Sequence, residues 1–139
     1  MTTMYERVEA NCWREEAKQL GLKALKSFWE APLSELAEQC NGAGAAGYGW
    51  IVPDTMYGLP ITAAAYNHDW AYYKGRTKKD RLRADWCFLY NMIKTIKRNP
   101  SRFWGIDRFR RMRACSYYRA VKRFGWIAFY VNRKPNKAS

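Results

Sequence analysis

Two helix-forming segments separated by a very short break constrain the fold of this chain more than any other feature. The first spans residues 62–74 and ends at Gly75. The second opens with Thr77 and Asp80, whose spacing is that of a capping box, and continues to about residue 98. Because the break is so short, we expect the two helices to lie antiparallel as a helical hairpin.

Helical patterns flank this hairpin on both sides. Residues 4–20 and 34–40 are predicted as N-terminal helices, and Thr62 is a plausible N-cap of the first hairpin helix. No alternating apolar and polar run is long enough to predict a strand. We therefore expect an all-α fold in a single domain over 1–139. Its parts are N-terminal helices (1–40), a glycine-rich loop (41–61), the helix hairpin (62–98) and a basic C-terminal helix (107–131).

The charge of the chain is divided unevenly between its halves. Residues 1–69 contain 5 Lys and Arg against 9 Asp and Glu, a net charge of −4, whereas residues 70–139 contain 20 against 3, a net charge of +17. Aromatic residues interleave with the basic ones in the last helix, among them Tyr117, Tyr118 and Trp126. This half therefore predicts a polyanionic partner, either an anionic lipid surface or a nucleic acid.

The cysteines exclude some functions. Cys12, Cys40, Cys87 and Cys115 form no CxxC pair and the chain has one histidine, which makes a zinc site improbable. The N-terminus lacks the apolar run of a signal peptide, so we expect free thiols and no disulfides. The longest strongly apolar run, residues 124–131, is too short to cross a bilayer, so no transmembrane segment is expected.

Asp85 is the residue that fits its surroundings least. It shares one predicted helix face with four apolar residues, Leu82, Leu89, Met92 and Ile96. A buried carboxylate is costly unless it is paired or hydrogen-bonded, so Asp85 needs a partner. The single histidine, His68, lies 7 residues before Gly75 and Asp85 lies 10 after it. At the rise of an α-helix the two come level across the hairpin.

This pairing suggests chemistry. A histidine whose one nitrogen donates to a carboxylate has a fixed tautomer, which leaves the other nitrogen as a general base. Tyr72, one turn after His68, is placed to donate to the same carboxylate. Asp69 projects about 100° away around the helix, where it and backbone carbonyls of the glycine-rich loop suit a calcium ion. The plainer alternatives are a structural His–Asp pair and a solvated Asp69.

Two short segments resemble a known superfamily. Residues 64–72, Ala-Ala-Tyr-Asn-His-Asp-Trp-Ala-Tyr, resemble the active-site helix CCxxHDxCY of the secreted phospholipase A2 superfamily, with alanine at each cysteine position. Residues 84–88, Ala-Asp-Trp-Cys-Phe, resemble its second active-site helix. The parvovirus capsid phospholipase domain shows a similar HDxAY followed by AD without disulfides.

The chain also resembles uncharacterised phage and prophage proteins. They share CNGxG, VPDTxxGLxI, HDWxY and ADxxFLxNM segments, found here at residues 40–44, 52–61, 68–72 and 84–92. The stretch 111–125, RxRAxxYYxAVxxFG, is similar as well. This resemblance implies a phage or prophage origin and a location in the bacterial cytoplasm or the virion, where other virion proteins are possible partners of the basic half.

The phospholipase resemblance implies a calcium-dependent ester hydrolase acting on anionic phospholipid. His68 would be the base that activates water, Asp85 and Tyr72 would orient it, and Asp69 would bind Ca²⁺. Carbonyls of Gly42 and Gly44 would complete the metal site, although they lie further from the histidine than the calcium loop of secreted phospholipases does. The alternative carbonyl ligands are those of Tyr48, Gly49, Tyr57 and Gly58.

Two other functions remain open on the sequence. One is a catalytically inactive, phospholipase-like virion or accessory protein. The other is a nucleic-acid-binding protein that neutralises phosphates with its basic C-terminal helix, which carries Arg108, Arg110, Arg111, Arg113, Arg119, Lys122 and Arg123. The surroundings of His68 discriminate between lipolysis and these alternatives.

Overall fold

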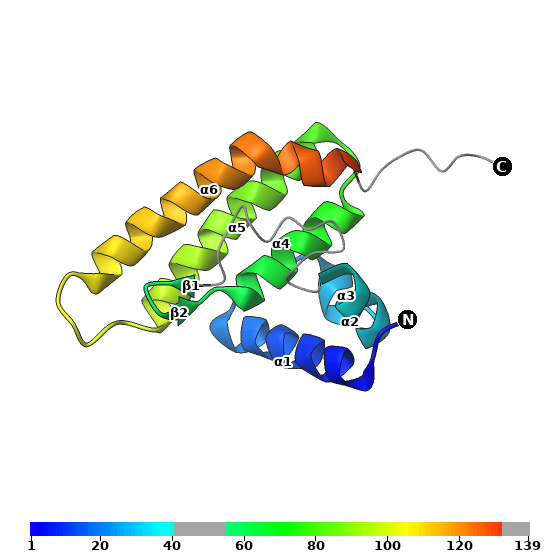
Figure 1. Ribbon diagram of the computed structural model, residues 1–139, viewed down its shortest axis with the longest axis horizontal. Helices are drawn as coiled ribbons and strands as arrows, with labels where there is room; N and C mark the ends of the chain where they lie inside the picture. The colour runs from blue at the N-terminus through cyan, green and yellow to red at the C-terminus, as the bar shows by residue number, and fades with distance from the viewer. Residues whose placement is uncertain (41–54, 132–139) are drawn as a thin grey trace.

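A computed structural model describes residues 1–40 and 55–131 of the chain (Figure 1). The described residues are helical apart from one small antiparallel hairpin, which confirms the all-α prediction. The elements are α1 (Met4–Leu20), α2 (Lys26–Glu30), α3 (Leu33–Cys40), β1 (Thr55–Met56), β2 (Leu59–Pro60), α4 (Thr62–Lys74), α5 (Lys78–Arg98) and α6 (Ile106–Val131). None of the described helices is both long and apolar enough to span a membrane.

Helices α4 and α5 form the predicted antiparallel pair. Thr77 and Asp80 make the predicted capping box, since the Thr77 side chain accepts from the Asp80 backbone and Asp80 accepts from the Thr77 backbone. Gly75 ends α4 with an extended backbone (φ −63°, ψ 154°), and a side chain there would be crowded, since a Cβ would lie 3.0 Å from the Ala71 carbonyl oxygen and 3.1 Å from the Phe129 ring. The tight turn therefore holds the two helices in close contact.

The predicted N-cap at Thr62 is wrong. Thr62 is already the first residue of α4, and Ile61 occupies the cap position without a side-chain hydrogen bond. The cause is tertiary packing, because Ile61 is buried in the main core and leads straight from β2 into the helix. Burial of this apolar side chain outweighs the local advantage of a polar cap.

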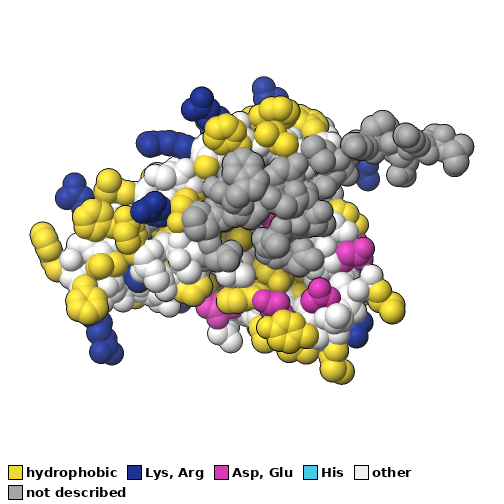
Figure 2. All heavy atoms as spheres, in the orientation of Figure 1, with side chains coloured by type: hydrophobic (Ala, Val, Ile, Leu, Met, Phe, Trp, Pro, Cys, Tyr) yellow, Lys and Arg dark blue, Asp and Glu magenta, His cyan; other side chains and the backbone are white. Residues whose placement is uncertain are grey.

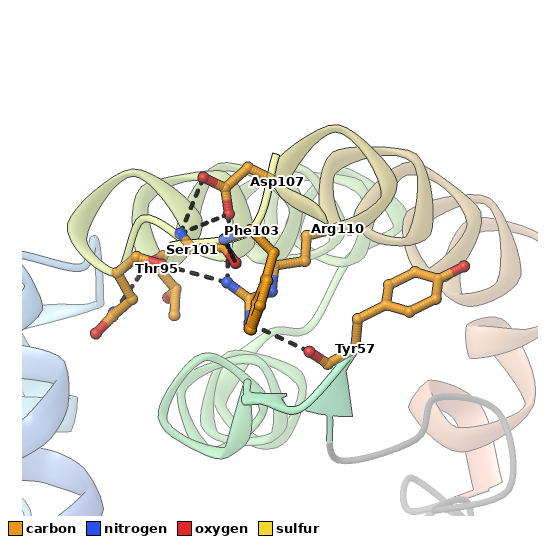
Figure 3. A network of polar contacts seen from close by, with 7 residues as sticks. Tyr57, Thr95, Ser101, Phe103, Asp107 and Arg110 are labelled. Carbon is orange, nitrogen blue, oxygen red and sulfur yellow. Dashed lines mark hydrogen bonds and ion pairs between the residues drawn. The ribbon is translucent and has the colours of Figure 1, made fainter. Parts of the chain in front are cut away.

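The hairpin of β1 and β2 was not predicted from the sequence. Its turn consists of Tyr57 and Gly58, which both have positive φ (47° and 79°), as a two-residue turn of type I′ requires. Each strand has only two residues, too few to show an alternating pattern. Contacts with α6 stabilise it: the Tyr117 hydroxyl donates to the Thr55 carbonyl (2.7 Å) and Arg110 donates to the Tyr57 carbonyl (3.2 Å; Figure 3).

Helix α5 lies between α4 and α6, while α1 and α3 pack on α4 (Figure 1). The inward side of α6 is a stripe of Ala114, Tyr117, Val121 and Phe129. Lys and Arg side chains gather toward the α5–α6 end in Figure 2, whereas Asp and Glu side chains lie over α1 and α3. The charge division along the sequence is thus also a division in space.

Two buried amides attach the N-terminal helices to the hairpin. Asn91 accepts from the Lys23 backbone N–H (2.8 Å) and donates to the Lys23 carbonyl (2.9 Å), and Asn67 donates to that same carbonyl. Nearby, Trp70 donates to the Ser27 hydroxyl (3.0 Å). These bonds fix the link between α1 and α2 against α4 and α5.

Candidate active site

The hairpin brings His68 of α4 and Asp85 of α5 together. His68 Nε2 lies 2.9 Å from Asp85 Oδ1, and the two side chains are 8% and 1% exposed. Asp85 lies in the middle of the α4–α5 interface, so its carboxylate is removed from solvent. The register predicted from the turn thus matches the geometry of the pair, whereas its catalytic role stays a prediction.

Tyr72 shares the carboxylate oxygen that His68 uses. Its hydroxyl donates to Asp85 Oδ1, as its place one turn after His68 predicts. Burial, followed by the charge and hydrogen bond of Asp85, raises the pKa of Tyr72 well above its usual range, so the phenol stays protonated and remains a donor. Tyr72 therefore helps to hold the carboxylate in one orientation.

Helix α6 closes over this hydroxyl. A Cβ built on Gly125 would overlap the Tyr72 hydroxyl oxygen and lie 3.2 Å from Tyr72 Cζ. Phe129, one turn further, meets the Tyr72 ring edge-on with the centroids 5.4 Å apart. Gly125 is therefore the position that lets α6 approach the site.

Aromatic rings also confine the imidazole. The Phe88 ring lies 4.7 Å from the His68 ring, centroid to centroid, and the Tyr72 ring lies 4.2 Å away. These contacts and the bond to Asp85 restrict the orientation of the imidazole. A ring held in one orientation loses less freedom when it takes part in a reaction.

Arg81 brings a positive charge close to Tyr72. It is buried one turn before Asp85 on α5, and its guanidinium donates to the Lys122 carbonyl (3.5 Å). Its charge acts on Tyr72, whose pKa it lowers against the larger opposing effects. Arg81 thus places a positive charge near the Tyr72 hydroxyl that binds Asp85.

Two atoms of the site have no hydrogen-bond partner among residues 1–40 and 55–131. They are Nδ1 of His68 and Oδ2 of Asp85, and the second is fully buried. With Nε2–H donating to an ionised carboxylate, Nδ1 carries a lone pair. That is the arrangement in which an imidazole accepts a proton from a bound water or hydroxyl group.

Asp69 lies near Cys40, whereas His68 is paired with Asp85. Burial raises the pKa of its carboxyl to about 7, against the opposing effect of the His68 charge. The Asp69 charge in turn adds to burial in raising the pKa of the Cys40 thiol. Asp69 is therefore a partly buried carboxylate near Cys40, at the C-terminal end of α3, and burial outweighs the effect of the His68 charge on it.

These properties fit one ligand of a cation site. A nearby cation stabilises the ionised form of a carboxyl group whose pKa is raised. Cys40, the last residue of α3, lies close to Asp69. Within the described part of the chain, no group of three or more His, Cys, Asp or Glu side chains suits a metal. Gly42, Gly44, Tyr48 and Gly49 lie outside the described residues.

Tyr57 and Gly58, also predicted as possible carbonyl ligands, form the turn of the β1–β2 hairpin before α4. The Tyr57 carbonyl accepts from Arg110 (3.2 Å), and the Arg113 guanidinium stacks 4.9 Å from its ring. An oxygen that faces a guanidinium is a poor position for a second cation. Asp69 lies seven residues into α4, about 10 Å along the helix from Thr62.

A cavity of about 290 Å³ lies away from the histidine. It opens between α1, β2, the start of α4 and the end of α5. None of His68, Asp85, Tyr72 or Asp69 lines it; its walls include Trp13, Leu20, Ile61, Ala64 and Thr95. The chemically capable side chains therefore do not face this cavity.

Sequence reasoning missed several residues that shape the site. Arg81 carried a signal, because it precedes Asp85 by four positions on the same helix. Gly125 did too, since a glycine inside a long helical pattern indicates a close approach. Phe88 was identified only as part of a motif, and nothing in the sequence indicated that Phe129 meets Tyr72.

Comparison of the chain with protein-family models, curated proteins and solved structures found no match.

Proposed function

We propose that the protein is a calcium-dependent, phospholipase A2-like ester hydrolase acting on phospholipid. The observation that carries the proposal is the buried His68–Asp85–Tyr72 arrangement, in which both donors bind Oδ1 of the carboxylate and His68 Nδ1 is left without a partner among the described residues. The motif HDxxY followed by AD, which resembles the phospholipase pattern, points to the same chemistry.

In this proposal His68 is the general base. Nδ1 takes a proton from a water as that water attacks the ester carbonyl, and the resulting imidazolium is stabilised by the Asp85 carboxylate. The same nitrogen then returns the proton to the leaving alcohol. Tyr72 keeps Asp85 in place throughout, and Phe88 restricts the tilt of the imidazole.

Asp69 is the residue we assign to calcium, together with backbone oxygens of the chain that follows α3. A bound calcium ion would polarise the ester carbonyl and stabilise the oxyanion. The raised pKa of Asp69 supports this assignment, because a bound cation would favour the ionised form of the carboxyl that burial disfavours.

The direct test is release of fatty acid from mixed micelles of phospholipid and detergent, with calcium and with a chelator. We expect calcium-dependent release, and a loss of at least about 100-fold in His68→Gln, since general-base catalysis contributes roughly that much. The matched control is Asn11→Gln on the exposed face of α1, which should hydrolyse at the wild-type rate.

Activity that survives in His68→Gln, or activity indifferent to calcium, would contradict the proposed mechanism. No release from any phospholipid by the folded wild-type protein would leave His68–Asp85 as a structural pair in an inactive scaffold. Asp85→Asn provides an independent readout, because it removes the negative charge that stabilises the imidazolium and keeps the size of the side chain. Asp85→Asn should lower kcat and leave KM nearly unchanged.

A further inference from the structure

One side of α6 combines positive charge with large apolar side chains. Its exposed residues at steps of four, seven, four, three and four positions are Arg108, Met112, Arg119, Arg123, Trp126 and Tyr130, and we name this set the outer face of α6. At the rise of an α-helix the face is about 33 Å long. The single acidic residue of α6, Asp107, is paired with Arg110 (3.3 Å), so no carboxylate interrupts it.

The loop before α6 adds two aromatic side chains. Phe103 is 76% exposed and Trp104 is fully exposed, at the end of the molecule where α5 passes to α6. Arg102 and Arg108 lie within a few residues of them and are also exposed. The most exposed aromatic side chains of the described chain thus sit among arginines.

This loop is held in shape by hydrogen bonds. The Ser101 N–H donates to both carboxylate oxygens of Asp107 (3.1 Å each), and the Phe103 N–H donates to the Ser101 hydroxyl (3.1 Å; Figure 3). Arg110 connects Asp107 to the Tyr57 carbonyl of the β hairpin. The backbone of the loop that carries Phe103 and Trp104 is therefore tied to the start of α6.

We infer that the outer face of α6 and the Phe103–Trp104 loop form a docking surface for an anionic lipid bilayer. Arginines attract anionic headgroups, and Trp and Tyr are the side chains that favour the membrane–water boundary. Met112 and Phe103 add exposed apolar area that insertion at a membrane surface would bury. Docking on a bilayer does not require turnover, so it extends beyond the proposed hydrolysis.

The same surface would attract nucleic acid through its arginines. Two features favour lipid. The aromatic anchors lie at both ends of α6, Phe103 and Trp104 before it and Trp126 and Tyr130 in its last turns, with arginines between them. The set also contains Met112, which has no flat π-face for base stacking. This arrangement suits a helix lying along a membrane surface.

The test uses the His68→Gln protein, so that the vesicles stay intact whether or not the wild-type protein is a hydrolase. Sedimentation with vesicles of phosphatidylcholine, with and without phosphatidylglycerol, gives the partition coefficient at physiological ionic strength. We expect binding to rise with the anionic fraction. The double substitution Arg119→Gln/Arg123→Gln should weaken it on the order of 30-fold.

Two matched controls separate the surface from charge and hydrophobicity in general. Lys18→Gln/Lys26→Gln removes the same charge from exposed positions of α1 and α2 and should bind like the parent. Phe103→Ser/Trp104→Ser should weaken binding about tenfold. Met4→Ser/Tyr5→Ser, on exposed positions of α1, should leave it unchanged.

Equal losses in the arginine and lysine pairs, or binding indifferent to phosphatidylglycerol, would overturn the inference. Displacement of the protein from vesicles by duplex DNA at equal phosphate concentration would also overturn it, because this result would assign the face to nucleic acid. Vesicle binding without hydrolysis by the wild-type protein would refute the proposed function and leave the docking surface standing. Hydrolysis of micelles without binding to anionic vesicles would do the reverse.

Discussion

Asn67 and His68 are neighbours on α4, and both point polar atoms into the protein, but their hydrogen bonding differs. Asn67 and Asn91 bind the backbone of Lys23, and the Asn91 amide both donates to it and accepts from it. The site of His68 and Asp85 instead leaves Nδ1 and Oδ2 without partners among the described residues. A buried group that is fully bonded contributes to stability, while one with a spare lone pair can act on a substrate.

The largest loss of stability is predicted for a substitution in the pair Asn67 and Asn91, whose amides bind the backbone of Lys23. Asn91→Ala removes two hydrogen bonds to Lys23 and leaves the Lys23 N–H without that acceptor, so the free energy of unfolding should fall by about 3 kcal/mol. Urea denaturation followed by circular dichroism measures this loss. A loss as small as that of an exposed control such as Gln19→Ala would show that the cluster is not structural.

Gly125→Ala tests how closely α6 approaches Tyr72, which binds Asp85. The new methyl group would overlap the Tyr72 hydroxyl, and we expect destabilisation of about 2 kcal/mol. In a Tyr72→Phe background the overlapping oxygen is gone, so the same change should cost distinctly less. A double-mutant cycle measures this coupling, and additive effects would contradict the assigned contact.

Asp69→Asn tests the carboxylate whose pKa is raised to about 7. Because the folded-state pKa lies above the unfolded value of 3.8, ionisation opposes folding, and stability is lost as the pH rises from about 4 to about 7. In the presence of a chelator, the Asn variant should therefore be more stable than wild type by roughly 1 to 2 kcal/mol at pH 8.

Near pH 3 the two proteins should unfold alike, because the Asp69 carboxyl is then largely protonated in both the folded and the unfolded state of the wild type. Urea titrations at the two pH values give the comparison. A difference that does not depend on pH would mean that the effect comes from packing at Asp69 and has no relation to its charge.

The smallest effect on stability is expected for His68→Gln. Glutamine retains an N–H that reaches toward Asp85, and His68 Nδ1 loses no bond to the described residues, so the change should stay within about 1 kcal/mol. The contrast with Asn91→Ala is the point of the measurement. A loss comparable to that of Asn91→Ala would place His68 with the structural residues.

The sequence predicted the features that depend on local signals. The capping box at Thr77 and Asp80 and the position of Gly75 set the hairpin, and the helical period then placed His68 opposite Asp85. Thr62 failed as a cap because the environment of Ile61, a tertiary effect, decided where α4 begins. The β hairpin needs two consecutive positive φ angles at Tyr57 and Gly58, and a tyrosine gives little indication of one.

The position of Asn67 beside His68 has a consequence for the whole N-terminal region. Consecutive residues of a helix are separated by about 100°, so the bond from Asn67 to Lys23, together with the buried residues of α4, fixes the rotation of α4 about its own axis. That rotation determines whether the imidazole is directed at Asp85. The segment joining α1 to α2 thus contributes to the orientation of the base, although it touches neither His68 nor Asp85 through a hydrogen bond.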